Sequence, residues 1–148
     1  MSSAIEQRLA DLGLSLPPAA APAANYVPFT VAGSLLFISG QVPIEDGRIA
    51  VTGKLGDGVD LERGQEAARL CALNVLAQAK AACGDLGRVR RCLRLGGFVA
   101  SAPGFTDQHK VINGASDLIA AVMGEAGRHA RFAGDRGVRH QGSCRGGG

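Results

Sequence analysis

The sequence is poor in aromatic residues, since its 148 positions hold five Phe, one Tyr and no Trp. Platforms on which bases or sugars could stack are therefore scarce, and Leu, Val, Ile and Ala must fill the core. No stretch is long and apolar enough to suggest a membrane span, and the first residues contain no apolar signal core. These absences argue against a membrane protein, and we expect a cytoplasmic one.

The four cysteines form no Cys-x-x-Cys pair and show no spacing typical of a zinc site. Two of them fall inside apolar periodic segments, where a thiol packs as a small apolar group. The sequence also contains no Gly-rich phosphate loop, no paired metal carboxylates and no Ser-His-Asp order. We therefore interpret the cysteines as reduced thiols rather than disulfides: Cys71, Cys83, Cys92 and Cys144.

The composition is that of one globular domain, with 46% hydrophobic and 20% charged residues. A domain of this length buries roughly 70% of the surface of its unfolded chain, so folding needs no disulfides. The net charge is +3, but three arginines and one aspartate after Phe132 supply +2 of it. The remaining +1 is weak support for a nucleic-acid partner.

The first 24 residues predict a helix followed by a connector. Ser3 and Glu6 fit a capping box, and apolar residues then repeat at helical spacing. A tract rich in Pro and Ala over residues 16–24 favours an extended connector laid over the surface.

Strand-forming residues begin at Tyr26. Residues 26–31 and 35–39 are rich in β-branched and aromatic residues and are separated by Ala-Gly-Ser, which predicts a β-hairpin. The second run ends in Ser39-Gly40-Gln41, where Gly and a nearby Pro stop the ladder. Polar side chains at a strand end are typical of a site, although turn formation alone also explains them.

Two helices are predicted in the second half of the chain. Asp60 can cap a helix over residues 61–83 that Gly84 closes. A second helix is expected over residues 107–125, with Gly127 as its stop.

Between these helices, residues 88–101 alternate Arg with apolar residues, which predicts a strand. One face of that strand would carry Arg88, Arg90 and Arg94. RNA phosphates could contact this row, but a solvated face explains it better because no aromatic residues interleave with the arginines.

The predicted order is strand, strand, helix, strand, helix, strand, which indicates an α+β fold with two helices on one face of a mixed sheet. The other sheet face would stay bare in a monomer, and its apolar side chains must be buried somewhere. An oligomer packed through its sheets is the simple solution.

The segment from Gly127 to Phe132 places cations at a helix-to-strand junction. Arg128 and Arg131 could hold a small carboxylate, because a guanidinium can donate two parallel hydrogen bonds to it. Plainer interpretations stay open: a solvated strand-edge position for Arg131, a helix C-terminal charge for Arg128 and a backbone-satisfied ring, rather than a proton shuttle, for His129.

These segments resemble the Rid family of reactive-intermediate deaminases, also called YjgF or endoribonuclease L-PSP, and most closely a subgroup with an extra N-terminal helix. The resemblance runs from about Ile5 to Phe132. Its blocks, in chain order, are Leu12-Gly13-Leu14-Ser15-Leu16-Pro17, Asn25-Tyr26-Val27-Pro28-Phe29, Ser39-Gly40-Gln41-Val42-Pro43, Gly53-Lys54-Leu55-Gly56, Asn113-Gly114-Ala115-Ser116-Asp117-Leu118 and Gly127-Arg128-His129-Ala130-Arg131.

The resemblance implies a chorismate-mutase-like fold assembled as a homotrimer, with three sites in the clefts between subunits. Family members that act as deaminases hydrolyse 2-aminoacrylate and related enamines or imines to 2-oxo acids and ammonia. The expected ligand is therefore a small 2-imino or 2-oxo acid. No metal or cofactor is needed, because a protonated imine is already electrophilic and requires mainly orientation and one water.

By position in the family motif, Arg131 is the catalytic arginine that holds the substrate carboxylate. His129, two residues earlier, is expected beside it as support. The other pocket residues implied by position are Tyr26 on the first strand, Ser39, Gly40 and Gln41 in the turn after the second, and Asn113 in the second long helix.

The chain departs from the family pattern at its C-terminus. The position two residues after the arginine, often cysteine in the family, is Ala133. The family continues with a Leu-Pro turn and a Val-Glu strand whose glutamate helps to place the attacking water, whereas no glutamate follows Glu125 here. Residues 133–148 are rich in Gly, so we expect a disordered or frameshifted tail there and a YjgF-like domain over residues 25–132.

Two alternative functions stay open on the sequence. The missing glutamate favours a non-catalytic trimer that binds small metabolites. The arginine row would suit an RNA-binding, endoribonuclease-type translation inhibitor, whose RNA binding should be strongly salt-dependent.

Overall fold

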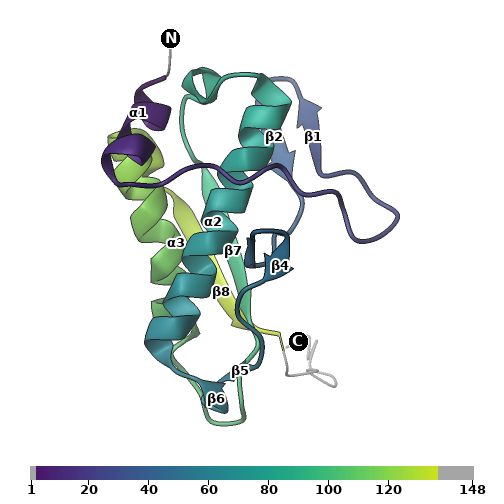
Figure 1. Cartoon of the computed structure of the whole chain (residues 1–148), viewed down its shortest axis with the longest axis vertical. Coiled ribbons are helices and arrows are strands. Elements are labelled where there is room, and N and C mark those ends of the chain that lie inside the picture. Colours follow the sequence, from purple (N-terminus) through teal and green to yellow (C-terminus); the bar gives the residue numbers. More distant parts are fainter. Residues whose placement is uncertain (1–2, 137–148) are drawn as a thin grey trace, which may run out of the picture.

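The computed structural model describes residues 3–136. In Figure 1 the long helix α2 runs along the molecule, with α1 and α3 on one side and the β1–β2 hairpin on the other, while β7 and β8 lie behind the helices. The elements are α1 (Ala4–Asp11), β1 (Phe29–Ala32), β2 (Leu35–Ile38), β3 (Ile44–Glu45), β4 (Arg48–Ile49), β5 (Lys54–Leu55), β6 (Gly58–Val59), α2 (Leu61–Cys83), η1 (Leu86–Arg88), β7 (Arg94–Val99), α3 (Gln108–Met123), η2 (Gly124–Gly127) and β8 (Ala130–Asp135).

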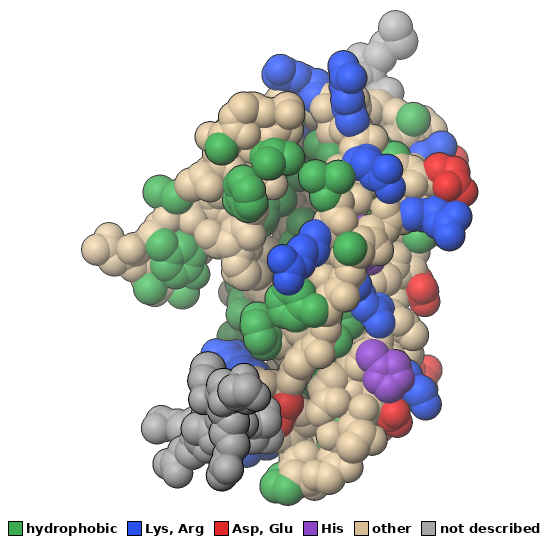
Figure 2. All heavy atoms as spheres, turned by 180° about the vertical axis from the view of Figure 1, so that it is seen from behind, with side chains coloured by type: hydrophobic (Ala, Val, Ile, Leu, Met, Phe, Trp, Pro, Cys, Tyr) green, Lys and Arg blue, Asp and Glu red, His purple; other side chains and the backbone are tan. Residues whose placement is uncertain are grey.

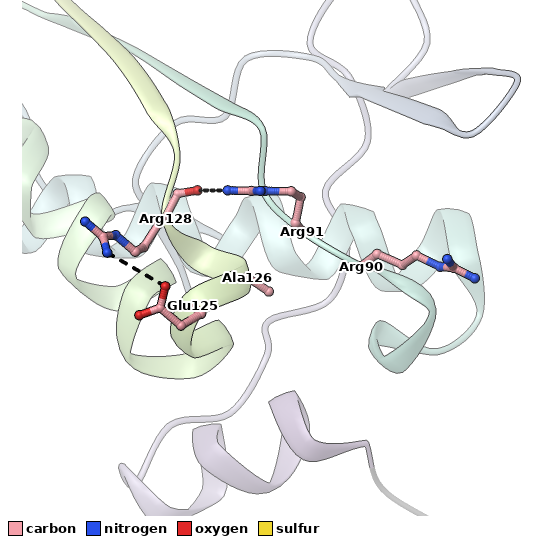
Figure 3. Close-up of a pocket in the computed structure, with 5 residues that line it drawn as sticks. All are labelled: Arg90, Arg91, Glu125, Ala126 and Arg128. Carbon is pink, nitrogen blue, oxygen red and sulfur yellow. Dashed lines mark hydrogen bonds and ion pairs between the residues drawn. The ribbon is translucent and has the colours of Figure 1, made fainter.

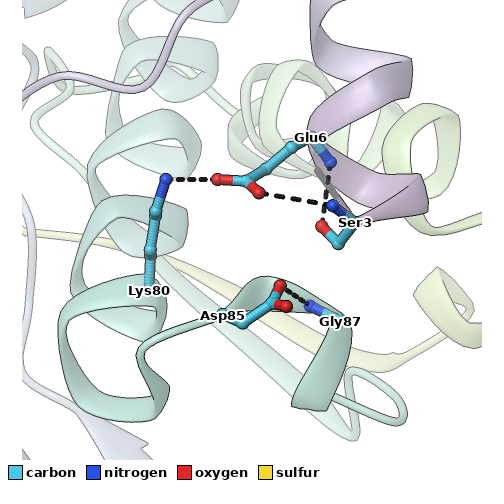
Figure 4. A network of polar contacts seen from close by, with 5 residues as sticks. All are labelled: Ser3, Glu6, Lys80, Asp85 and Gly87. Atoms are coloured by element: carbon cyan, nitrogen blue, oxygen red, sulfur yellow. Dashed lines mark hydrogen bonds and ion pairs between the residues drawn. The ribbon is translucent and has the colours of Figure 1, made fainter. Parts of the chain in front are cut away.

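Helix α1 starts with the predicted capping box, in which Ser3 and Glu6 exchange side-chain and backbone hydrogen bonds. The Glu6 carboxylate also pairs with the Lys80 ammonium of α2 (Figure 4). Its hydrogen bond with Lys80 is the main reason that the pKa of Glu6 lies below its ordinary value. The N-terminal helix is therefore fixed on the rest of the fold, and its buried Ile5 and Leu9 join the main core.

Helices α2 and α3 pack with their backbones in close approach. A Cβ atom built on Gly114 of α3 would lie 2.1 Å from the backbone oxygen of Gln65 in α2. Small buried residues of α2, such as Ala68 and Ala72, allow the same approach further along. The glycine that interrupts helix propensity at Gly114 is therefore explained by helix packing.

The strand pairing differs from the single mixed sheet that the sequence predicted, since the described strands form four two-stranded sheets. Strands β1 and β2 form the predicted antiparallel hairpin. Strands β7 and β8, which helix α3 connects along the chain, pair directly with each other in parallel. The predicted order of strands and helices is confirmed, with short β3 to β6 ladders added between the hairpin and α2. Both long helices lie on the same side of β7 and β8 (Figure 1).

The strand predicted over residues 88–101 begins only at Arg94, and that prediction was wrong for residues 88–93. Arg88 ends the 3₁₀ turn η1. The segment that follows η1 forms an isolated backbone hydrogen bond with the chain before β8, from Cys92 N–H to the Ala126 oxygen at 2.8 Å. Alternation of Arg with apolar residues therefore arose in a loop, where it does not define a face.

Two glycines take roles that differ from the predicted ones. Helix α3 ends at Gly124, which has a φ of +62°, and not at Gly127. Gly127 is required for another reason, because a Cβ there would lie 2.5 Å from the backbone oxygen of Ile119. Within β7, Gly97 allows the Ile112 side chain to approach the strand, as a Cβ would meet it at 2.3 Å.

Strand β8 continues to Asp135, three residues past the boundary expected at residue 132. The remainder of the predicted tail, residues 137–148, lies outside the described residues. No helix between residues 3 and 136 is both long enough and apolar enough to cross a membrane.

The face of the strands turned away from the helices exposes large apolar side chains. Phe98 is 69% exposed, Phe37 58% and Leu35 44%, and the ring of Phe132 packs edge-on against Phe98 at 5.5 Å between centroids. Figure 2 looks at the molecule from behind and shows green hydrophobic side chains interspersed with blue Lys and Arg side chains. The bare sheet face that the sequence predicted is thus present on the single chain.

Candidate functional site

The Arg131 guanidinium lies against helix α3 and is held by three hydrogen bonds. Its Nη1 donates to Asn113 Oδ1 at 2.8 Å and to Ser116 Oγ at 3.1 Å. Its Nη2 donates to the backbone oxygen of His109 at 3.0 Å. Arg131 occupies an inward-facing position of β8, opposite Leu95 of β7, which explains why the side chain points to α3 and not to the bare strand face.

These three bonds leave part of the guanidinium available. An arginine has five N–H donors, and both hydrogens on Nη1 and one on Nη2 are used. The Nε–H and the second Nη2–H of Arg131 bond to nothing in the described part of the chain. Donors on the neighbouring nitrogens Nε and Nη2 can form the fork that binds a carboxylate, so the arrangement can hold one anionic group.

The structure brings Asn113 and His129, both predicted from the sequence, to Arg131. Asn113 accepts a hydrogen bond from the arginine and therefore orients it. The His129 ring lies between two oxygens, with Nε2 2.9 Å from Ser116 Oγ and Nδ1 2.5 Å from the backbone oxygen of Gly127.

Ser116 was not predicted as a site residue. It lies three positions after Asn113 on helix α3, and residues at this spacing share one helix face. Its hydroxyl contacts both His129 and Arg131, so it links these two side chains of the predicted cluster. The i, i+3 spacing was the signal in the sequence that could have identified it.

The second predicted group lies at the end of the hairpin. Ser39 Oγ donates to the Val27 oxygen at 2.7 Å, and Gln41 Nε2 donates to the Ser39 oxygen at 3.0 Å, which folds the Ser39-Gly40-Gln41 turn back on itself. Tyr26 is 49% exposed. Among the described residues, no hydrogen bond joins this group to Arg131, Asn113 or His129.

A buried amide fixes the chain just after this turn. Asn74 of α2 is only 1% exposed, and its Nδ2 donates to the backbone oxygen of Ile44 at 3.0 Å. The same nitrogen lies 2.9 Å from the Leu70 oxygen within its own helix. The turn that carries Ser39 and Gln41 is thereby tied to the rigid long helix.

The end of β8 carries the carboxylate nearest to Arg131 along the strand. Asp135 Oδ1 accepts from Ser101 Oγ at 2.8 Å, and Ser101 Oγ in turn accepts from Gln108 Nε2 at 3.1 Å. This network closes the gap between β7, β8 and the start of α3.

A second feature is an open hollow of about 500 Å³ lined by Arg90, Arg91, Glu125, Ala126 and Arg128. Arg91 donates to the backbone oxygen of Arg128 at 3.0 Å, and Arg128 lies 3.7 Å from the Glu125 carboxylate. In Figure 3 the side chains of Arg90 and Arg128 extend in opposite directions. The guanidinium groups therefore do not converge on one anion.

The arginine row predicted on the strand is also dispersed. Arg88 donates to the backbone oxygen of Cys83 at 3.2 Å, while Arg94 stacks on the Phe132 ring, 4.9 Å from its centroid. Arg88 and Arg94 therefore do not form, together with Arg90, a row of side chains along which RNA phosphates could bind.

The described cysteines are free thiols. Burial raises the pKa of Cys71 to about 11, and burial is also the main cause that raises the pKa of Cys92. Both therefore stay protonated near neutral pH and are poor nucleophiles. No cluster of three or more His, Cys, Asp or Glu side chains within residues 3–136 is placed to hold a metal ion. Cys144 lies outside the described residues.

Comparisons with known proteins agree with this architecture. The sequence model of a family described as "YjgF/chorismate_mutase-like, putative endoribonuclease" matches residues 6–143. Protein TCP17 of Trypanosoma cruzi is 51% identical over 133 residues, which span 89% of this chain and 83% of that protein. The structure of Atu1372, a protein of unknown function from Agrobacterium tumefaciens, is 59% identical and has a TM-score of 0.83, over 89% of this chain and 81% of that one. A "putative endoribonuclease" from Shewanella oneidensis is 40% identical with a TM-score of 0.88, over 90% and 89% of the two chains.

Proposed function

The chain belongs to the YjgF/chorismate mutase-like family, and from this premise we propose that it hydrolyses small 2-imino acids to 2-oxo acids and ammonia. The observation that carries the proposal is the Arg131 guanidinium, which three hydrogen bonds hold on α3 while one donor on Nε and one on Nη2 are left for a ligand. A fixed fork of this kind suits a small carboxylate better than an extended polyanion.

The reaction needs little beyond orientation. A water oxygen adds to C2 of the protonated imine, and one proton passes from that water to the nitrogen. The C2–N bond then breaks with its electron pair on nitrogen, and the C2 hydroxyl gives up its proton to the departing ammonia, which leaves the 2-oxo acid and ammonium. Arg131 would hold the C1 carboxylate so that C2 faces the water, and the hydroxyls of Tyr26 and Ser39 and the Gln41 amide would contact the other end.

The site requires a second subunit in this account. The hairpin group and the Arg131 group share no hydrogen bond, and β8 pairs only with β7, in the part of the chain that the structure describes. The exposed apolar strand face supplies the surface through which copies of the chain would pack. A homotrimer with Arg131 of one subunit facing Tyr26 of the next satisfies both requirements.

The main alternative is a trimer that binds 2-oxo acids or similar metabolites without converting them. It is favoured by the absence of a glutamate after Glu125, since the family's water-positioning group has no counterpart in this sequence. RNA cleavage, suggested by the words "putative endoribonuclease" for the Shewanella oneidensis protein, is less well supported because the arginines of the hollow point apart (Figure 3).

A coupled assay distinguishes these functions. A pyridoxal-phosphate dehydratase acting on serine releases 2-aminoacrylate, and 2-oxo acid formation is followed with and without the purified chain. We expect a rate above the uncatalysed hydrolysis that scales with the concentration of the chain. No acceleration, together with measurable binding of pyruvate, would instead support the non-catalytic alternative.

A further inference from the structure

Ser116 and His129 come from different elements and meet behind the arginine. Ser116 lies on α3, and His129 lies in the short link between η2 and β8. The serine hydroxyl is 2.9 Å from His129 Nε2 and 3.1 Å from Arg131 Nη1, so one oxygen joins the two residues. None of the roles assigned above to the ligand-contacting residues explains this arrangement.

The hydrogens in this network can be assigned by starting at the Gly127 backbone oxygen. The Gly127 backbone oxygen can only accept, so the His129 Nδ1 at 2.5 Å from it must carry the proton. The Nε2 of a neutral ring then accepts, and the Ser116 hydroxyl donates to it. The Ser116 oxygen is left with its lone pairs for the Arg131 N–H. Every donor therefore points in one direction, from the arginine through the serine and histidine to the Gly127 backbone.

This direction has a consequence for the arginine. A serine hydroxyl normally rotates, but here its hydrogen is fixed by His129 and its lone pair is aimed at Nη1. With Asn113 as the second acceptor, both hydrogens of Nη1 are bound, which fixes the plane of the guanidinium as well as its position. The carboxylate fork of Arg131 lies in that plane.

We propose that Ser116 and His129 are positioning residues that set the plane in which Arg131 binds a ligand carboxylate. The proposal rests on the proposed function, because it concerns the same anchor, and it assigns the specificity for a planar carboxylate to residues that do not touch the ligand. Ser116 acts on Arg131 directly, and His129 acts by orienting the Ser116 hydroxyl.

The test compares pyruvate with its neutral amide, pyruvamide, by calorimetry on the full chain. For Ser116→Ala we expect the Kd of pyruvate to rise about tenfold, the effect typical of one lost hydrogen bond to a charged group. The Kd of pyruvamide should change less than about twofold, since its neutral amide gains little from the guanidinium plane. A merely structural role for Ser116 would weaken both ligands equally, and that result would overturn the proposal.

Two substitutions of the histidine separate its nitrogens. Gln at position 129 can present an acceptor near the place of Nε2, whereas Asn can present a donor near the place of Nδ1 but cannot reach Ser116. We expect His129→Gln to keep most of the pyruvate affinity and His129→Asn to lose as much as Ser116→Ala. Ser116→Thr, which retains the hydroxyl, should restore binding. Asp117→Asn, an exposed neighbour on α3, is the control and should bind pyruvate as the unmodified chain does.

The outcomes also separate this inference from the proposed function. If the unmodified chain binds pyruvate and Arg131→Ala does not, while Ser116→Ala binds normally, only the positioning role is wrong. If the unmodified chain and Arg131→Ala bind pyruvate equally, the anchor itself is wrong and both claims fail.

Discussion

Replacing Arg131 with alanine is expected to lower kcat/KM for 2-aminoacrylate hydrolysis by about 100-fold or more. Hydrogen bonds to a charged group contribute about 1.5–3 kcal/mol each, and the fork provides two of them. The truncation also removes the Nη1 donor of Asn113 and the Nη2 donor of the His109 carbonyl. The coupled assay measures this effect, because the rate at several substrate concentrations gives kcat/KM for each variant.

Two further variants make this result specific. Arg131→Lys keeps the charge but not the planar fork, and we expect it to recover only a small part of the activity. Arg90→Ala removes the same charge from an exposed loop position and should leave kcat/KM unchanged. Activity of Arg131→Ala close to that of the unmodified chain would remove the carboxylate anchor from the account.

Gly114→Ala is expected to be the most destabilising single methyl addition in the helical layer. The new Cβ would lie 2.1 Å from the Gln65 oxygen and 2.8 Å from its carbonyl carbon, and neither atom can move without shifting α2. Overpacking two helix backbones in this way costs about 3 kcal/mol, which corresponds to a fall in Tm of about 10 °C for a domain of this size. Thermal unfolding followed by circular dichroism measures it.

The control for this prediction is Gly40→Ala, because a Cβ at Gly40 has nothing within 4 Å and its backbone is not left-handed. Its Tm should stay within about 2 °C of the unmodified chain. Equal melting temperatures for Gly114→Ala and the unmodified chain would show that α2 and α3 do not pack as closely as described.

Local signals in the sequence predicted the helix ends well where a side chain makes the cap. Asp60 accepts from Arg63 N at 2.8 Å and starts α2, and Gly84, with a φ of +79°, follows its last residue. The end of α3 was predicted wrongly because Gly124 and Gly127 are both present. The choice between them depends on the Ile119 carbonyl packing against Gly127, a contact that local propensity does not report.

The sequence predicted only part of the site, because some of its contacts depend on how distant segments pack. Arg131 and Asn113 were expected together from the family resemblance, and the structure places them 2.8 Å apart. Ser116 was missed although its i, i+3 spacing places it on the helix face of Asn113, because its contacts with His129 and Arg131 depend on the strand packed opposite. The false strand at Arg88 to Leu93 shows the converse, since alternation was present without a partner strand to pair with.

The most direct test of an intersubunit site anchored by Arg131 is complementation between two inactive variants. Arg131→Ala and Tyr26→Ala chains are mixed in equal amounts, unfolded and refolded together, and assayed beside the separately refolded parents. Random assortment gives about a quarter of the sites an intact Arg131 from one chain and an intact Tyr26 from its neighbour. We predict that the mixture recovers about a quarter of the activity of the refolded unmodified protein. A mixture as inactive as its two parents would contradict a site shared between subunits.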